Sequence, residues 1–321
     1  MLRQGVVTVS AAVSETIFLE RAASIIRSGG LVAFPTETVY GLGADALNPD
    51  AARRIYAAKG RPSDNPLIVH IADPGDIAPL TERVTPAAEK LINMFWPGPL
   101  TVILKKTKLV PDETTGGLDT VAVRMPDHPA ALGLIRLSGV PVAAPSANIS
   151  GRPSPTRAEH VAADLGGVID MIMDGGECRV GLESTVADCT GDVPVILRPG
   201  AITAEMIGAA PGAHGDVRRS PGTRYRHYSP LAPIIVTDAP PRELSEADGA
   251  LCFDDTRSEY CGGAVVSLGA RSDAAQAMRN FFAALRSFDA SGVRLIYAET
   301  PPDTPDFAAL RDRLFRAAMP L

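Results

Sequence analysis

The sequence predicts an α/β protein with two domains: a mixed α/β first domain and a small second domain whose sheet is parallel. Its 321 residues exceed one typical domain and suit two, each able to bury its own core. Short apolar runs of strand type alternate with segments of helical periodicity over most of the chain. The periodicity disappears between residues 209 and 233, where Gly, Pro, Arg, Tyr and His dominate. We therefore expect a first domain at residues 1–208, a linker at 209–233 and a second domain at 234–321.

The first domain is expected to alternate helices and strands along the chain. Asn48 and Pro49 are typical of a helix N-cap and first helical residue, and Gly60 is typical of a C-terminal stop, so a helix is expected between them. Other helices are expected at residues 15–28, from Thr85-Pro86 to Trp96, after His128-Pro129 and at residues 158–165. Strands are expected at residues 6–9, 31–34, 67–71, 101–104, 120–125, 140–144, 169–173, 184–188 and 193–197.

The second domain repeats a simpler alternation. Strands are expected at residues 234–237, 250–253, 264–268 and 293–297. Before the last of them, a helix places Ala277, Phe281, Leu285 and Phe288 on one face, and a terminal helix carries Phe307, Leu310 and Leu314. Short strands that alternate with helices predict a small, Rossmann-like parallel sheet.

Composition excludes several classes of function. The formal net charge of -6 and the pI of about 5.4 argue against a protein whose main task is to grip a nucleic acid, because that affinity depends on neutralising phosphates. The four cysteines lack C-x-x-C spacing and no metal-binding motif occurs, so neither a disulfide framework nor a protein metal site is expected. No apolar run approaches the ~20 residues that span a bilayer. We expect a cytoplasmic protein.

A compact polar corner lies between the two strands at residues 31–34 and 67–71. The first strand ends at Pro35 and is followed by hydroxyl-bearing residues, at the kind of strand end where α/β folds bind ligands. The intervening helix ends in Lys59 and Arg61, and the second strand carries His70. Separated cations beside amide and hydroxyl donors are what triphosphate oxygens require. The corner therefore suits an anion.

The segment Gly41-Leu42-Gly43-Ala44-Asp45-Ala46 formally fits the dinucleotide fingerprint G-x-G-x-x-A. It lies too far beyond the strand at residues 31–34, and about twenty residues on, cations stand where the ribose-binding acid is expected. We therefore reject an NAD-dependent enzyme. A P-loop is also missing from the sequence, so any ATP binds without one.

The motifs as a set resemble one known family. They comprise PTETVYGLG at residues 35–43, the K-x-R pair at 59–61, N-P-L-x-x-H at 65–70, and the stretches 121–126, 144–148, 184–186, 197–200 and 220–230. This pattern resembles the YrdC-like family of threonylcarbamoyl-AMP synthases, in its long form with an additional C-terminal domain. The resemblance covers nearly the whole chain and implies a YrdC-like mixed α/β first domain.

The resemblance also implies a reaction. L-Threonine, bicarbonate and ATP give threonylcarbamoyl-AMP and pyrophosphate, the intermediate used to make threonylcarbamoyladenosine in transfer RNA. Magnesium would arrive on the nucleotide. We expect a hand-over of the product to the tRNA threonylcarbamoyl transferase, and no stable nucleic-acid binding and no membrane association. Two rival functions remain: an RNA-binding, translation-associated module, and a carbamoyl-transfer enzyme.

Site residues follow from the same resemblance. It places the ATP site at Arg61, Asn65, Thr120, Ser146, Asn148, Ser154 and Arg198. It places the threonine site at Thr38, His70, Arg124, Ala144 and Ser184. The cations Lys59, Arg61 and Arg124 are the residues expected to stabilise the reacting charges.

Structural alternatives stay open at each of these positions. Lys59 and Arg61 also suit a solvated helix end, where cations favour the negative pole of the dipole. Arg124 lies in an apolar strand, so it needs either a substrate carboxylate or an internal acidic partner. Ser146 and Asn148 also suit caps of a following segment. A lone His70 would ordinarily be a core histidine.

The linker carries aromatic and basic residues that an ordinary linker does not need. Residues 223–228, Thr-Arg-Tyr-Arg-His-Tyr, lie between Pro221-Gly222 and Ser229-Pro230. We expect this segment to fold over the first domain's pocket as a lid, in which Tyr228 or Tyr225 meets the nucleotide and Arg226 adds charge near its phosphates. The alternative is that these residues only join the two domains.

Overall fold

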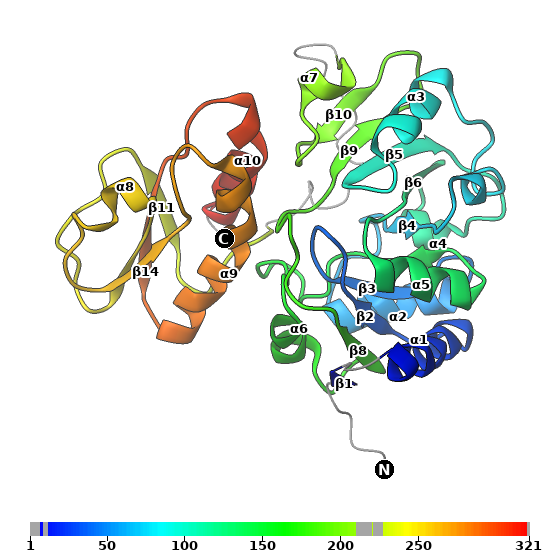
Figure 1. The fold of residues 1–321 in the computed structure, drawn as a ribbon, viewed down its shortest axis with the longest axis horizontal. Coiled ribbons are helices and arrows are strands. Elements are labelled where there is room, and N and C mark those ends of the chain that lie inside the picture. Colours follow the sequence, from blue (N-terminus) through cyan, green and yellow to red (C-terminus); the bar gives the residue numbers. More distant parts are fainter. Residues whose placement is uncertain (1–6, 9–11, 210–219, 221–226, 320–321) are drawn as a thin grey trace.

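The computed structural model describes residues 7–8, 12–209, 220 and 227–319. Two α/β bodies lie side by side, and the helices α9 and α10 of the second body face the first (Figure 1). The predicted fold class, a mixed α/β first domain followed by a parallel-sheet second domain, is confirmed.

The first body contains a ten-stranded mixed sheet in the order β1-β8-β2-β3-β7-β4-β6-β5-β9-β10. Its strands are β1 (Val7–Thr8), β2 (Val32–Phe34), β3 (Gly41–Asp45), β4 (Ile68–His70), β5 (Leu100–Lys105), β6 (Thr120–Arg124), β7 (Val142–Ala143), β8 (Met171–Asp174), β9 (Thr185–Asp188) and β10 (Val195–Arg198). Its helices are α1 (Ala12–Arg27), α2 (Pro49–Lys59), the 3-10 turn η1 (Pro74–Ile77), α3 (Pro86–Phe95), α4 (Asp112–Thr115), α5 (Pro129–Ser138), α6 (Ala158–Leu165) and α7 (Ala204–Ile207).

Helix α2 begins and ends as its sequence predicts. The Asn48 side chain accepts hydrogen bonds from the backbone N–H groups of Asp50 and Ala51, at 3.0 and 3.3 Å. Gly60 closes the helix at φ 61°, a left-handed conformation that glycine adopts without steric cost. The helix is thereby held so that Lys59 and Arg61 emerge at its C-terminal end.

Strand β3 corrects one expectation. We expected no strand between residues 34 and 67, but Gly41–Asp45 forms a strand of its own, antiparallel to β2, with Phe34 opposite Gly41. Glycine fits here because a Cβ at Gly43 would lie only 2.8 Å from the Phe34 ring and 2.9 Å from Val142. The G-x-G pattern therefore serves close strand packing, in agreement with the rejection of a dinucleotide site.

The two faces of this sheet differ. On one face, Ala33, Val69 and Val123 belong to the largest core cluster, which also contains residues of α2, α3 and α6. On the other face, α1 and α5 pack over Val32 and Phe34 at one end, and a small apolar cluster that includes Ile103 and Val186 lies at the other. The side chains between these two clusters surround the cavity described below.

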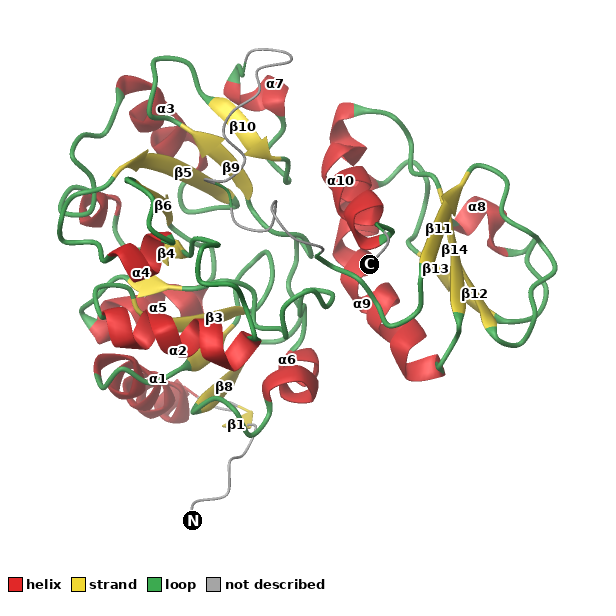
Figure 2. Cartoon of the chain, turned by 180° about the vertical axis from the view of Figure 1, so that it is seen from behind, coloured by secondary structure: helices red, strands yellow, loops and turns green. Residues whose placement is uncertain are grey.

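The second body has a four-stranded, all-parallel sheet in the order β11-β14-β12-β13. Its elements are β11 (Ile234–Thr237), β12 (Asp248–Cys252), α8 (Asp254–Arg257), β13 (Ala264–Ser267), α9 (Ala274–Ser291), β14 (Leu295–Glu299), the 3-10 turn η3 (Pro305–Phe307) and α10 (Ala308–Ala317). Helices α9 and α10 separate this sheet from the first body, whereas α8 lies on the opposite side (Figure 2).

The two bodies share a core. Val39 and Leu182 of the first body belong to the same buried cluster as Phe282 and Leu285 of α9. Gly181, at φ 81°, lies against α9 so closely that a Cβ there would be 2.4 Å from the Arg279 Cα. The loop before β9 is therefore fixed directly by the second domain.

Candidate functional site

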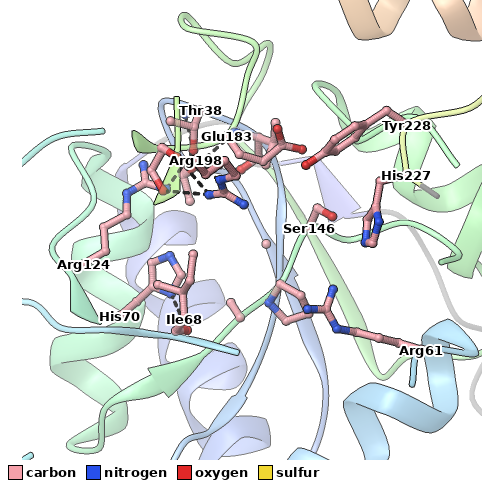
Figure 3. A pocket seen from close by; sticks show the side chains of 16 residues that line it. Thr38, Arg61, Ile68, His70, Arg124, Ser146, Glu183, Arg198, His227 and Tyr228 are labelled. Carbon is pink, nitrogen blue, oxygen red and sulfur yellow. Dashed lines mark hydrogen bonds between the residues drawn. The ribbon is translucent and has the colours of Figure 1, made fainter. Parts of the chain in front are cut away.

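A polar cavity of about 530 Å³, including the part open to solvent, lies between the sheet of the first body and the end of the linker. Arg124 and His70 lie at one side, and Tyr228, His227 and Arg61 at the other (Figure 3). Nine of the residues that the sequence predicted line it: Thr38, Arg61, His70, Arg124, Ala144, Ser146, Ser184, Arg198 and Tyr228.

Strand alternation brings His70 and Arg124 into the cavity. Parallel strands β4 and β6 pair with His70 opposite Arg124 and Ile68 opposite Ala122. Because successive side chains of a strand point to opposite faces, these four residues share the open face of the sheet. The pairing register of β4 and β6 therefore places His70 and Arg124 side by side in the cavity wall.

Arg124 is 3% exposed and has an internal acidic partner, one of the two alternatives left open by the sequence. Its Nη2 lies 2.7 Å from Glu37 Oε1, and its Nη1 donates to Thr38 Oγ1 at 2.9 Å. The ion pair is in contact but poorly aligned, since neither Glu37 oxygen has a hydrogen bond among the described residues. Glu37 balances the buried charge, while Arg124 still borders the cavity beside Thr38.

Arg61 lines the opposite side, where its partners within the described chain are backbone oxygens. Its guanidinium donates to the backbone oxygens of Asn65 and Pro66, at 3.0 to 3.3 Å, and the ion pairs of the described residues include none for Arg61. Burial lowers the pKa of this guanidinium to about 10, and it remains a cation at neutral pH. The side-chain amide of Asn65 is fully buried and has no hydrogen-bond partner within the described chain. A buried cation next to an unsatisfied amide is an incomplete site that an anionic ligand would complete.

Ser184 and Arg198 form the wall between these two sides. Arg198 donates through Nε and Nη2 to the Ser184 backbone oxygen, at 3.2 and 3.0 Å, and Nη2 also approaches Ser184 Oγ at 3.2 Å. Thr101 Oγ1 lies 2.7 Å from the same Ser184 hydroxyl. The Ser184 side chain is thereby fixed from two neighbouring strands.

His70 is a neutral group in this site. Burial, and then the positive charge of Arg124, lower the pKa of His70 to about 3. The ring packs edge-on against Phe34, with centroids 6.0 Å apart. At neutral pH His70 therefore offers an uncharged imidazole next to a cation.

Tyr228 closes the cavity from the linker. It is 3% exposed, its ring packs on Phe282 of α9 with centroids 5.4 Å apart, and its φ is 70°. A bulky side chain at positive φ is uncommon and persists where the surrounding structure enforces it. Tyr225 and Arg226, the other lid residues that the sequence suggested, lie outside the described residues.

Comparison with known proteins identifies the family. Residues 24–200 match the family model for Sua5, YciO and YrdC proteins, which is described as "Telomere recombination". The chain belongs to the Sua5/YciO/YrdC family. Residues 202–319 match a second family model, described as "Threonylcarbamoyl-AMP synthase, C-terminal domain", so the resemblance to the long form is confirmed.

Relatives match over nearly the full chain. The threonylcarbamoyl-AMP synthase of Bacillus subtilis is 47% identical over 320 residues, which cover 94% of this chain and 92% of that protein. The crystal structure of Pyrococcus abyssi Sua5 complexed with L-threonine has a TM-score of 0.85 at 44% identity and covers 94% of both chains. A variant of that protein, with a histidine and the following tyrosine replaced by alanine, has a TM-score of 0.87 at 42% identity and covers 98% of this chain and 96% of its own.

Five residues expected in the family's site do not line the cavity. Lys59 is the clearest case: its Nζ donates to the backbone oxygens of Ser146 and Asn148, and its pKa is lowered by burial and then by the charge of Arg61. The ammonium group thus anchors the loop that carries Ser146, and Lys59 is not among the residues that line the cavity. Burial of the helix end, which the K-x-R spacing does not reveal, explains this difference.

The other four lie nearby or further along the same strands. The Asn148 side chain bonds to Ser146 and to the carbonyls of Ile149 and Arg152, the local role that was the structural alternative. Thr120 lies four residues before Arg124 on the same strand face, about 13 Å away. Ser154 is fully buried and donates to Glu183. Asn65, described above, is the fourth.

Sequence reasoning missed two acidic residues. Glu37 is hidden inside PTETVYGLG as one polar residue among hydroxyls, and Glu183 precedes the Ser184-Thr185-Val186 motif. Both are buried carboxylates beside cavity arginines, and Glu183 itself lines the cavity. A glutamate next to a buried strand indicates that a cationic partner is needed. The sequence alone does not show which residue that partner is.

The described residues hold no group of three or more His, Cys, Asp or Glu side chains arranged for a metal ion. In the same part of the chain, no helix is both long enough and apolar enough to cross a membrane.

Proposed function

We propose that this chain is a threonylcarbamoyl-AMP synthase, which converts L-threonine, bicarbonate and ATP to threonylcarbamoyl-AMP and pyrophosphate. The observation that carries the proposal is a single cavity with two different polar sides: one formed around Arg124, Thr38 and Ser184, the other around Arg61. Relatives with the same activity in their names share 47% of their residues with this chain.

The side around Arg124 suits an amino acid. A guanidinium held by Glu37 and Thr38 presents a fixed fork to a carboxylate, a geometry that lysine does not reproduce. The neutral His70 and the hydroxyl of Ser184 supply polar contacts without a second positive charge. Together with Ala144, these residues form the proposed threonine site, consistent with the threonine bound to the Pyrococcus abyssi relative.

The side around Arg61 suits the nucleotide. Arg61 and the unpartnered amide of Asn65 offer a charge and polar donors, Ser146 and Arg198 border the path towards the threonine side, and Tyr228 covers it. Asn148 and Ser154 belong to the proposed ATP site as neighbours of this wall, through Ser146 and Glu183 respectively. Thr120, at the other end of strand β6 from Arg124, belongs to it by the family resemblance. Lys59 supports it indirectly, through the loop that carries Ser146.

The chemistry asks for positioning more than for acid–base catalysis. The threonine amine must lose a proton and attack bicarbonate, with loss of water, to give a carbamate. A carbamate oxygen then attacks the α-phosphorus, and pyrophosphate leaves with the electron pair of the broken P–O bond. Fixed cations such as Arg61 and Arg124 stabilise the charges of both steps, and a closed cavity protects the carbamate from water.

Magnesium enters this proposal with the nucleotide. Mg²⁺ is ordinarily held by phosphate oxygens and water, supplemented by one or two carboxylates. The donor set of the described chain fits this arrangement, since its cavity offers cations and hydroxyls to the phosphates and no cluster of acidic ligands. When bound, the ion would neutralise charge on the leaving pyrophosphate.

The linker is the proposed lid. Its described end places Tyr228 and His227 in the cavity wall, and the sequence contains this His-Tyr pair once. The variant of the Pyrococcus abyssi relative also has a histidine and the following tyrosine replaced, a pair of the same two residue types. We propose that closure over the site retains the carbamate until threonylcarbamoyl-AMP passes to the tRNA threonylcarbamoyl transferase.

A pyrophosphate assay tests the function. The purified chain is incubated with ATP and Mg²⁺, with and without L-threonine and bicarbonate, while pyrophosphate is followed. We expect release only when both threonine and bicarbonate are present. Formation of ADP and phosphate, or equal rates without threonine, would reject the proposal and favour a carbamoyl-transfer enzyme or another ATPase.

A further inference from the structure

One arginine of the second domain reaches the cavity wall of the first. Arg313, on α10, has the largest fully buried side chain among the described residues. Its Nε donates to Glu183 Oε2 at 2.9 Å, and its Nη2 donates to the Pro199 backbone oxygen at 2.9 Å. Its remaining donor, Nη1, pairs with Asp312 of the same helix. The guanidinium thus joins α10 to two points of the first domain, the Glu183 carboxylate and the Pro199 backbone.

The first point is a carboxylate in the site. Glu183 lines the cavity. One of its carboxylate oxygens accepts a hydrogen bond from Arg313, and the other accepts one from the Ser154 hydroxyl. Burial by itself would raise the pKa of Glu183, but the charges of Arg313 and then Arg198 outweigh it and keep the pKa below its ordinary value. Glu183 is therefore an anion on which two arginines act: Arg313 of the other domain, which is hydrogen-bonded to it, and then Arg198.

The second point is the backbone next to Arg198. The Pro199 oxygen that Arg313 binds directly follows Arg198, whose guanidinium contacts Ser184. The Arg313 guanidinium also lies over the Tyr228 ring, 5.4 Å from its centroid. Arg313 is therefore connected to three residues assigned to the nucleotide. It contacts the Tyr228 ring directly, binds the backbone next to Arg198, and shares the Glu183 carboxylate with Ser154.

We infer that Arg313 is a positioning residue for the nucleotide side of the cavity, through which docking of the second domain sets the affinity for ATP. The inference rests on the proposed function for the identity of the nucleotide. Without Arg313, the Glu183 carboxylate retains Arg198 as the other cation acting on it, and it would draw that guanidinium away from the phosphates. Loss of ATP affinity should then depend on the Glu183 charge.

The experiment measures ATP binding by calorimetry and steady-state kinetics on the full chain. In Arg313→Met we expect the Kd and the KM for ATP to rise at least tenfold, at least three times more than the KM for threonine. Arg313→Lys keeps the charge but loses one of the two cross-domain hydrogen bonds, so its Kd for ATP should lie between those of wild type and Arg313→Met. The double variant Glu183→Gln/Arg313→Met should recover ATP affinity to within about threefold of wild type, since the competing carboxylate is gone.

Arg286→Met is the matched control. Arg286 joins the same two domains by a buried ion pair with Asp164, at 2.8 Å, and by a hydrogen bond to the Pro153 backbone oxygen, next to Ser154. Its hydrogen-bond and ion-pair partners among the described residues do not include any that line the cavity, and it does not contact Glu183 there. We expect it to leave the Kd for ATP within about threefold of wild type, even where the thermal midpoint falls. Equal loss of ATP affinity in Arg286→Met would overturn the inference, since general loosening of the domains would then explain both.

Two further results would also overturn it: unchanged ATP affinity in folded Arg313→Met, and failure of the Glu183→Gln exchange to restore affinity. If Arg313→Met does not fold, Arg313→Lys and the double variant decide by the same criteria, because neither leaves Glu183 as an uncompensated buried charge. The calorimetric arm needs no turnover. A wild type that binds ATP but ignores threonine would therefore reject the proposed reaction while the test of Arg313 still stands.

Discussion

Two buried arginines of the cavity differ in how their charge is balanced. Arg124 contacts Glu37, whereas Arg61 has only carbonyl oxygens for partners among the described residues. A buried cation without a counter-ion is costly, and an anionic ligand relieves that cost. The charge of Arg61 is therefore available to a ligand, while that of Arg124 is largely compensated before anything binds. This difference predicts different effects of the two residues on binding.

Replacement of Arg61 should mainly impair the use of ATP. In Arg61→Ala we expect kcat/KM for ATP to fall at least tenfold, because a charge-assisted hydrogen bond contributes about 1.5–3 kcal/mol and each ~1.4 kcal/mol is a decade. The control is Arg53→Ala, on the exposed side of the same helix, where Arg53 pairs with Asp50 at 2.6 Å. Steady-state kinetics with varied ATP measure both variants. Unchanged efficiency in Arg61→Ala would assign Arg61 to a structural role at the helix end.

His70 should make the protein less stable in mild acid. Its pKa is about 3 in the folded protein and about 6.5 in the unfolded chain, so between these values only the unfolded chain binds the proton. The free energy of unfolding should therefore fall as pH decreases below about 6.5, by about 1.4 kcal/mol per pH unit for this one proton. His160, whose pKa burial lowers to about 4, contributes a second proton of the same sign.

Urea unfolding between pH 5 and 7 checks this prediction. In His70→Gln, the dependence of unfolding free energy on pH should be shallower than in wild type by one proton, and the slope due to His160 should remain. Identical slopes in the two proteins would show that His70 is protonated in the folded state.

Residue types in motifs could be predicted from the sequence, but their environments could not. The motif residues Thr38, Arg124 and Ser184 do meet in one cavity. Lys59 does not line this cavity, because its helix end is covered by the loop at residues 146–150. The K-x-R spacing of Lys59 and Arg61 does not predict that loop. Charge compensation by Glu37 depends likewise on a contact between segments almost ninety residues apart, which local patterns do not specify.

At the scale of elements, the strands with continuous apolar runs were predicted, and the strand with two glycines, β3, was not. Helix α2 has the capping residues expected of it, and β11 coincides with its predicted residues 234–237. Strand β3 was missed because its glycines resemble a loop, although they are needed for contact with Phe34 and Val142. Tyr228 also requires a revision. An exposed lid residue could be replaced by alanine at little cost in stability, but the Tyr228 ring is buried against Phe282, so Tyr228→Phe is the informative variant.

Gly181 and Gly176 allow a matched test of how the loop before β9 docks on α9. Both have positive φ, 81° and 80°, so alanine costs about 1–2 kcal/mol of backbone strain at either position. Only at Gly181 would the new Cβ also clash, 2.4 Å from Arg279 Cα, whereas nothing lies within 4 Å at Gly176. We therefore expect Gly181→Ala to be destabilised by about 1–3 kcal/mol more than Gly176→Ala.

Thermal unfolding measures the difference. One kcal/mol corresponds to about 2–4 °C for chains somewhat shorter than this one, so the midpoint of Gly181→Ala should lie several degrees below that of Gly176→Ala. Equal midpoints would mean that the two domains separate easily enough to accommodate the methyl group.

For the whole molecule, the charge distribution separates binding of small anions from binding of nucleic acid. The sequence contains 31 Lys and Arg against 37 Asp and Glu, a net charge of -6. Several of the arginines are inside the protein, among them Arg61, Arg124, Arg198 and Arg313, where they face the cavity or support its wall.

The domain boundaries at residues 208 and 234 remain predictions. In the structure, the two domains share a core and the buried ion pairs Arg313–Glu183 and Arg286–Asp164, so they are expected to act as a unit.

Binding to bulk transfer RNA should accordingly be weak. Affinity for nucleic acid comes mainly from cations that neutralise backbone phosphates, and its logarithm falls steeply with the logarithm of salt concentration when many phosphates are contacted. Here the buried cations Arg61, Arg124 and Arg198 line a cavity, and an acidic chain repels a polyanion at long range. We expect a Kd above about 10 μM at physiological salt, within the range of non-specific binding or weaker.

Fluorescence anisotropy with labelled transfer RNA at 50 and 200 mM salt measures this affinity. Submicromolar affinity with a steep salt dependence would instead support the RNA-binding module, since only an extended basic surface outside the cavity could produce it.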